Sequence, residues 1–256
     1  ASNNTGIGSF ALKANTTGAD NTAVGYQALD ANTTASNNTA VGKSALGANT
    51  TGAGNTALGN LTLAANTTAG DNTAVGYNAL NDCTTGSSNV AVGTYALDAS
   101  TTAANNVAVG KSALTANTTG AQLTAVGALS LDANTTAADN TAVGYNALGA
   151  NTTGASNTAV GKDALTANTT GHSNVAMGAY AMDALTTGVE AVAIGAYALT
   201  AASGSSNVAL GYKAGENVTT GTNNIFLGKE TGRSGSPGGS ITTGDNEVVI
   251  LSLIHI

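Results

Sequence analysis

The segment Asn140-Thr-Ala-Val-Gly144 is repeated, with small changes, along almost the whole chain of 256 residues. Its glycine recurs every 17 residues from Gly8 to Gly195, and one step of 16 residues and one of 17 lead on to Gly211 and Gly228. A period this regular indicates one structural unit stacked many times, in which each unit contacts its neighbours. We therefore expect one elongated repeat array rather than several globular domains.

The residues before the glycine predict a short strand. An aliphatic residue such as Val24 always precedes the glycine, and Thr, Val or Ile stands two residues earlier in nearly every unit. This alternation is typical of a strand with one buried face. A leucine or methionine, such as Leu29, follows the glycine by four residues. We expect the chain to turn at the glycine, which supplies a turn conformation or a close backbone approach, so that the aliphatic and leucine columns enter one core.

These patterns predict an all-β fold, a parallel β-solenoid with one coil per 17-residue unit and about fourteen coils. Residues 1–228 are expected to form the solenoid. Residues 229–250 are interpreted as a Gly/Ser-rich insertion followed by a final irregular coil. Residues 251–256 break the pattern at once, and we interpret them as a non-native tail.

Composition narrows the possible functions. The chain has seven basic and fourteen acidic residues and no basic cluster, so we expect no nucleic-acid partner. No apolar run approaches the ~20 residues of a membrane-spanning helix. Aromatic residues make up 4% of the chain, which predicts a narrow core of Val, Leu and Ala. Cys83 is the only cysteine, so an intrachain disulfide is excluded.

The sequence offers no catalytic constellation. His172 stands at a predicted corner with no cysteine or second histidine at ligand spacing, and it is interpreted as a solvated turn residue. The two Gly-Lys-Ser segments lack the glycine that a phosphate-binding loop requires. We therefore predict a non-enzymatic protein without a cofactor or a metal site.

An asparagine stands four residues before most of the glycines, as Asn21 and Asn38 do. Identical amides stacked one above another can hydrogen-bond along an array. We expect an asparagine ladder or a turn cap in this column, and ligand recognition is the alternative.

Two ranks of side chains are candidate surface contacts. A Thr-Thr pair recurs in eleven consecutive units, with neighbouring coils expected ~4.8 Å apart, and tyrosines stand one or two residues after the glycine. The alternative roles are turn formation for threonine and packing, at a corner or between protomers, for tyrosine. Regular threonine arrays are also what ice-binding solenoids present, and Asn-Thr-Thr is in addition a glycosylation sequon. The candidate contacts are Thr33, Thr50, Thr67, Thr118, Thr135, Thr152, Thr169, Tyr26, Tyr77 and Tyr145.

The unit Asn-x-Ala-Val/Ile-Gly, followed by a turn of small residues, resembles the head repeats of trimeric autotransporter adhesins, the YadA-like family. Similar repeats occur in phage tail fibres. The resemblance covers residues 3 to about 250, although the units here are longer, with the additional residues around Asn-Thr-Thr. It implies a left-handed parallel β-roll, three chains side by side, and a role in attachment, and it carries over no catalytic residue.

We therefore expect a structural, non-enzymatic segment of a surface adhesin or a viral tail fibre. Its expected location is extracellular, on a cell surface with an outer-membrane anchor or on a virion. Its expected partners are two further copies of itself and a host-surface receptor or glycan. The small alanines two residues before the glycine, such as Ala23 and Ala40, are expected to allow close packing between chains. The alternative function is ice binding through the stacked threonines.

Overall fold

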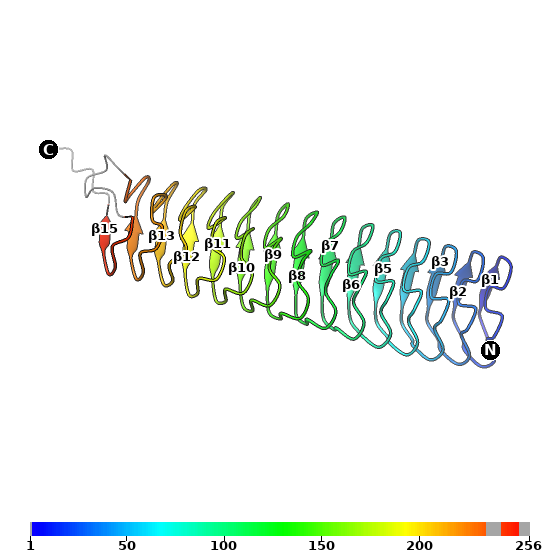
Figure 1. Cartoon of the computed structure of the whole chain (residues 1–256). Coiled ribbons are helices and arrows are strands. Elements are labelled where there is room, and N and C mark those ends of the chain that lie inside the picture. Colours follow the sequence, from blue (N-terminus) through cyan, green and yellow to red (C-terminus); the bar gives the residue numbers. More distant parts are fainter. Residues whose placement is uncertain (1, 234–241, 251–256) are drawn as a thin grey trace. The chain divides into compact units, whose positions relative to one another are not determined.

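The computed structural model describes residues 2–233 and 242–250, and these contain strands and turns but no helix. The chain divides into two units, Ala1–Leu129 with Ala133–Thr136, and Ser130–Asp132 with Ala137–Ile256. In each unit, coils are stacked with one three-residue strand per coil (Figure 1). The first unit contains β1 (Thr5–Ile7), β2 (Thr22–Val24), β3 (Thr39–Val41), β4 (Thr56–Leu58), β5 (Thr73–Val75), β6 (Val90–Val92), β7 (Val107–Val109) and β8 (Thr124–Val126). The second contains β9 (Thr141–Val143), β10 (Thr158–Val160), β11 (Val175–Met177), β12 (Val192–Ile194), β13 (Val208–Leu210), β14 (Ile225–Leu227) and β15 (Val248–Ile250).

Within each unit the strands pair in parallel and in register. Thr22 of β2 lies opposite Thr39 of β3, and the offset of 17 residues recurs through the first unit. The predicted parallel β-solenoid is confirmed. It has about 13 turns, because thirteen intervals separate the fourteen regular glycines. β14 and β15 pair across a longer connection that includes the predicted Gly/Ser-rich insertion. Part of that insertion, residues 234–241, and the predicted tail, residues 251–256, lie outside the described residues. The handedness and the trimer remain predictions.

The core is made of alanine and leucine. The central alanine of the strand, the alanine three residues after the glycine, and the leucine that follows it are all fully buried, as Ala74, Ala79 and Leu80 show. The prediction for the leucine column is thus confirmed. The prediction for the aliphatic column was wrong, because residues such as Val75 lie on the outer side of the strand and are only half-buried. The coil is narrow enough that leucine from the opposite wall leaves room for no more than a methyl group beneath the strand.

The same finding overturns the proposed role of the alanine column. Ala23 and Ala40 are 0% exposed inside their own coil, so they cannot pack against another chain. Alternation along the strand places the residues on either side of alanine outside the solenoid. Any contact between copies on this wall must therefore use those outer residues.

The recurring glycine is required for both of the expected reasons. Gly59 has φ of 142°, a conformation that L side chains rarely adopt. A Cβ atom added to it would also lie 2.5 Å from the carbonyl oxygen of Gly76 in the next coil. The glycines therefore stack directly on one another, and their close approach keeps the coils in register.

In most coils three further residues have a positive φ without being glycine. In the second coil these are Gln27, Leu29 and Asn37, with φ of 55°, 50° and 62°. For a leucine this is unusual and costs about 1 kcal/mol. Its backbone is held by two hydrogen bonds: Leu29 N–H donates to the carbonyl of Ala45 at 3.1 Å, and Asn32 N–H donates to the carbonyl of Leu29 at 3.2 Å. The neighbouring coil therefore helps to hold the strained turn in place.

One part of the second unit is packed differently. Phe226 occupies the central position of β14, where most strands have alanine, and it is fully buried. Gly215 and Gly232 occupy the leucine column on the two coils beside it. A Cβ on Gly215 would lie 3.0 Å from the phenyl ring, and one on Gly232 would lie 2.6 Å from it. The ring fills the space that two leucines fill elsewhere.

Candidate interaction surface

The outward side of the strands forms a continuous surface within each unit. We call it the outer strand face, and it consists of the first and third residues of each strand. The first residue is Thr, Val or Ile and the third is Val, Leu, Ile or Met, so the face of the described strands contains no charged side chain. Each residue lies opposite its equivalent in the next strand, as Val24 does with Val41. The face therefore presents two parallel ranks, one of mixed threonine and aliphatic residues and one wholly aliphatic.

The threonines predicted as contacts are largely occupied in holding the coils together. The first residue of each Thr-Thr pair from Thr33 to Thr169 is half-buried, whereas Thr16 and Thr186 are exposed. The hydroxyl of Thr50 donates to the carbonyl oxygen of Thr67 in the next coil at 3.0 Å, and the same bond recurs from Thr67 to Thr84 at 3.1 Å. These hydroxyl hydrogens are thus committed to the backbone and are not free to donate to a ligand.

The second threonine of each pair is the exposed one. Thr34, Thr51 and Thr68 are exposed, and so are their equivalents in the neighbouring coils. Because the coils are in register, these side chains form a regular rank beside the rank that was predicted. The sequence pointed to this pair of columns but could not show which of the two threonines faces solvent.

Both asparagine columns form buried ladders. In the column before the strand, Asn38 N–H donates to Oδ1 of Asn21 at 3.0 Å, and Asn21 Nδ2 donates to the carbonyl of Ala35 at 2.8 Å. In the Asn-Thr-Thr column, Asn49 Nδ2 donates to Oδ1 of Asn32 at 3.1 Å and to the carbonyl of Gly52 at 2.9 Å. The predicted ladder is confirmed. The sequon amides of these residues are fully buried and hydrogen-bonded, so the folded coil does not offer them for glycosylation.

The Asn-Thr-Thr ladder is interrupted at Cys83, Ser100 and Leu185, and the buried Ser100 hydroxyl has no hydrogen-bond partner among the described residues. Cys83 replaces asparagine next to Asn66, and Oδ1 of Asn66 has no hydrogen-bond partner among the described residues. Leu185 has the same effect on Oδ1 of Asn168. The Cys83 thiol donates to the carbonyl of Gly86 at 3.2 Å, and burial raises its pKa to about 11. Cys83 is therefore an unreactive packing residue.

The predicted tyrosines lie on an exposed corner. Tyr26, Tyr77 and Tyr145 are 46%, 44% and 50% exposed. Tyr77 packs edge-on against Tyr95 of the next coil, with ring centroids 5.4 Å apart, and Tyr26 packs in the same way against Phe10 at 5.9 Å. Aromatic contacts between coils thus explain part of this column, as the packing alternative predicted. The remaining ring surface is open to solvent.

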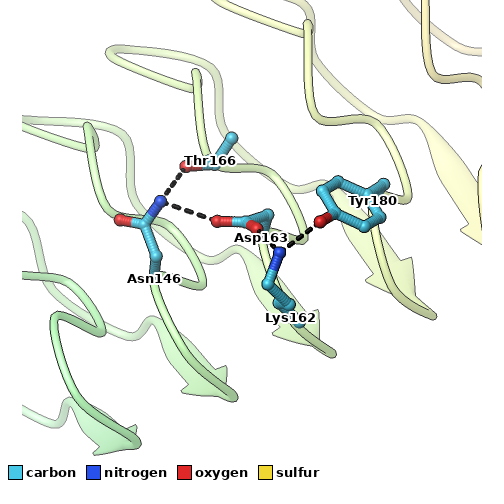
Figure 2. A network of polar contacts seen from close by, with 5 residues as sticks. All are labelled: Asn146, Lys162, Asp163, Thr166 and Tyr180. Carbon is cyan, nitrogen blue, oxygen red and sulfur yellow. Dashed lines mark hydrogen bonds and ion pairs between the residues drawn. The ribbon is translucent and has the colours of Figure 1, made fainter.

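In the second unit the same corner carries a polar network (Figure 2). Lys162 donates to Oδ2 of Asp163 at 2.7 Å and to the hydroxyl of Tyr180, and its ammonium group lies 4.3 Å from the centre of the Tyr180 ring. Asn146 Nδ2 donates to Asp163 Oδ1 and to Thr166 Oγ1, both at 2.8 Å. The network joins three successive coils.

Hydrogen bonding in this network also stabilises its charges. The hydrogen bonds from Lys162 to Asp163 and then to Tyr180 raise the pKa of the lysine well above its usual range. Burial alone would raise the pKa of Asp163, but the hydrogen bonds from Lys162 and Asn146 outweigh it and lower that pKa. Because the lysine and the carboxylate neutralise each other, the network is better suited to fastening coils than to binding an ion.

His172 is an exposed corner residue whose Nδ1 lies 3.2 Å from the hydroxyl of Ser173. Within residues 2–233 and 242–250, no group of three or more His, Cys, Asp or Glu side chains is placed to hold a metal ion. The same residues include no helix of the length and apolarity needed to cross a membrane.

The main surface that sequence reasoning missed is the outer strand face. The sequence did contain a signal for this face, because a polar threonine at the first strand position indicates a side chain that points toward solvent. Comparison with known proteins does not add a family assignment: no family model matches the chain, and no curated protein matches it.

Proposed function

We propose that this chain is a structural, non-enzymatic segment of an extracellular fibre, either a cell-surface adhesin anchored in an outer membrane or a virion tail fibre. It mediates attachment to a host surface. The observation that supports this best is the repetition of one exposed surface from coil to coil. Each threonine corner places the second hydroxyl at the same position, so a weak contact made by one coil is available to its neighbours. Repeated weak contacts increase overall affinity without any single strong site.

The internal hydrogen bonds suit a stack of coils that carries load. The asparagine ladders, the threonine hydroxyls and the strand backbone all connect each coil to the next. Pulling one coil away from its neighbour therefore breaks several hydrogen bonds together. In the proposed assembly three copies lie side by side, and a host receptor or glycan binds the exposed corners.

Binding of the intact chain to host cells and to glycan-coated surfaces tests the proposal. The triple variant T34K/T51K/T68K places a long charged side chain on the exposed threonine rank and should weaken attachment strongly. The triple variant T34V/T51V/T68V is the matched control, because valine keeps the shape and removes only the hydroxyl. A chain that binds neither cells nor glycans at any concentration tested would contradict the proposed function.

Ice binding is the second candidate function, and the exposed threonine rank is the observation that favours it. Because Thr33, Thr50 and Thr67 are half-buried, the candidates for ice contact become their exposed neighbours Thr34, Thr51 and Thr68. A thermal-hysteresis measurement separates the two functions. Strong hysteresis that is lost in T34K/T51K/T68K would replace attachment by ice binding, and its absence would leave attachment as the better explanation.

A further inference from the structure

The outer strand face changes in character near the end of the second unit. In β11–β15 all ten outward side chains are aliphatic, whereas the first position of most earlier strands is threonine. The third position also changes, from the valine that predominates in β2–β10 to larger residues. The ten residues are Val175, Met177, Val192, Ile194, Val208, Leu210, Ile225, Leu227, Val248 and Ile250, and we call them the aliphatic patch.

The aliphatic patch is well exposed to solvent. Met177, Ile194, Leu210 and Leu227 are 41%, 42%, 36% and 43% exposed, and Ile250 is 57% exposed. With Ile225 at 44% and Val248 at 62%, the exposed residues of the patch leave on the order of 600 Å² of aliphatic surface in water, which is at the upper end of the largest patch on a typical monomer. It also approaches the roughly 800 Å² that each partner buries in a stable interface.

The chemistry of the patch fits a second copy of the same chain. When two identical chains lie parallel and in register, each rank of outward residues faces the same rank, or the neighbouring rank, of the other chain. A charge on either rank would then face a like charge. The patch has none. The charges nearest to it in the sequence are Glu190, Lys229 and Glu247, which flank the patch residues and are not part of the patch. Farther from it, Lys213 and Arg233 pair with Glu216 at 2.9 and 2.8 Å. Across the patch itself, a parallel copy therefore meets aliphatic side chains and no like charge.

We propose that copies of this chain associate through the aliphatic patch on β11–β15, and that the threonine-bearing strands of the first unit are not required for that association. The inference rests on the proposed fibre function, because it assigns the contact that holds the copies side by side. Burial of aliphatic surface supplies the driving force. The threonine-bearing face, which is less apolar, remains available to solvent or to a receptor.

Two matched double variants test the location of the contact. I194D/L210D adds two carboxylates to the patch in β12 and β13. T39D/T56D adds the same charge to exposed positions of the outer strand face in β3 and β4. The mass of each intact protein is measured by light scattering and sedimentation at micromolar concentration, and circular dichroism checks the fold. We expect an oligomeric parent, an oligomeric T39D/T56D, and an I194D/L210D variant whose dissociation constant rises at least ~10-fold.

A third variant covers the case in which the aspartates disturb folding. I194T/L210T places a β-branched residue at both positions and replaces apolar surface with an uncharged hydroxyl, so it should fold and still weaken association. A monomeric parent, an oligomer unaffected by I194D/L210D and I194T/L210T, or equal dissociation of the patch and T39D/T56D variants would overturn the inference. So would a parent that stays monomeric and floats with zwitterionic lipid vesicles.

The outcome is separable from that of the proposed function. An oligomer that depends on the patch but attaches to no surface would contradict the attachment proposal alone. A monomer that still attaches to cells would contradict the location of the contact alone.

Discussion

Exchanging Phe226 for the residues that other coils use at the same place should reveal how the coil interior is filled. The phenyl ring is fully buried and occupies the space beside Gly215 and Gly232, where other coils have leucine. Phe226→Ala removes the ring and leaves a cavity that the narrow coil cannot close. We expect it to lower the free energy of unfolding of the second unit by about 3–5 kcal/mol.

The compensating change is Gly215→Leu. By itself it forces a side chain against Leu199 and the ring, since a Cβ there already lies 2.8 Å from Leu199 Cδ2 and 3.0 Å from Phe226 Cδ2, and it should cost about 1–3 kcal/mol. The backbone itself tolerates leucine, because Gly215 has φ of 64° and the leucines of other coils have φ near 50°. In F226A/G215L the new side chain fills the new cavity, so the two losses should not add.

The assay is a double-mutant cycle in guanidinium chloride followed by circular dichroism. A repeat array need not unfold in one step, so hydrogen exchange of the β13 and β14 amides should accompany it. We expect a favourable coupling of at least ~2 kcal/mol between the two sites. Losses that simply add, or a Phe226→Ala variant as stable as the parent, would refute the packing described here.

Three other substitutions test separate features. Cys83→Asn should stabilise the first unit by about 1–3 kcal/mol, because its amide can donate to the unpartnered Oδ1 of Asn66 and accept from the unpartnered Ser100 hydroxyl; an unchanged denaturation midpoint would count against the ladder. Gly59→Ala should lower the free energy of unfolding by about 2 kcal/mol or more, because Gly59 has a positive φ and an added Cβ would meet Gly76. Gly47→Ala should be nearly neutral, because φ is not positive there and the nearest atom to an added Cβ is 3.4 Å away. Equal effects of the two substitutions would argue against stacked glycines. Burial and then the nearby charge of Asp82 raise the pKa of Asp98, so ionisation of Asp98 destabilises the folded state, and the parent should lose stability as pH rises through that pKa. Asp98→Asn should therefore be more stable than the parent at pH 7 and indistinguishable from it at pH 3, and a variant less stable at pH 7 would show that the carboxylate is stabilising.

The regular features of the fold were predictable because one repeat of the sequence is read many times. The fixed glycine spacing predicted the coil, and the alternation of residue types before the glycine predicted the strand. The recurrence of leucine and of asparagine at the same place in each unit predicted the inward leucine and the asparagine ladder. Val24 was assigned to the wrong side because a strand of three residues has only one central position, and hydrophobicity alone favours valine over alanine inside. The positive φ of Leu29 was not foreseeable either, because leucine rarely adopts it and the neighbouring coil supplies the hydrogen bonds that hold it.

The candidate surface was predictable only in part. The recurrence of these residues in the sequence pointed to the Thr-Thr and tyrosine columns. Which threonine of a pair is exposed depends on a hydrogen bond between coils, such as the one that the Thr50 hydroxyl donates to the carbonyl oxygen of Thr67. The outer strand face became visible once alanine was known to point inward. Its aliphatic end at β11–β15 can be read in the sequence after that orientation is known, and not before.

Distances between spin labels test most directly the claim that each 17-residue unit is one coil of a parallel stack. In a Cys83→Asn background, one label replaces Thr22 and a second replaces, in turn, Thr73, Val90, Val107 or Thr124, all outward positions of the first unit. Dilution with unlabelled protein suppresses distances between copies. The distance should rise by ~4.8 Å with each coil, from about 14 Å for the first pair to about 29 Å for the last. Distances that stay constant, alternate or fall as coils are added would contradict the stacked solenoid.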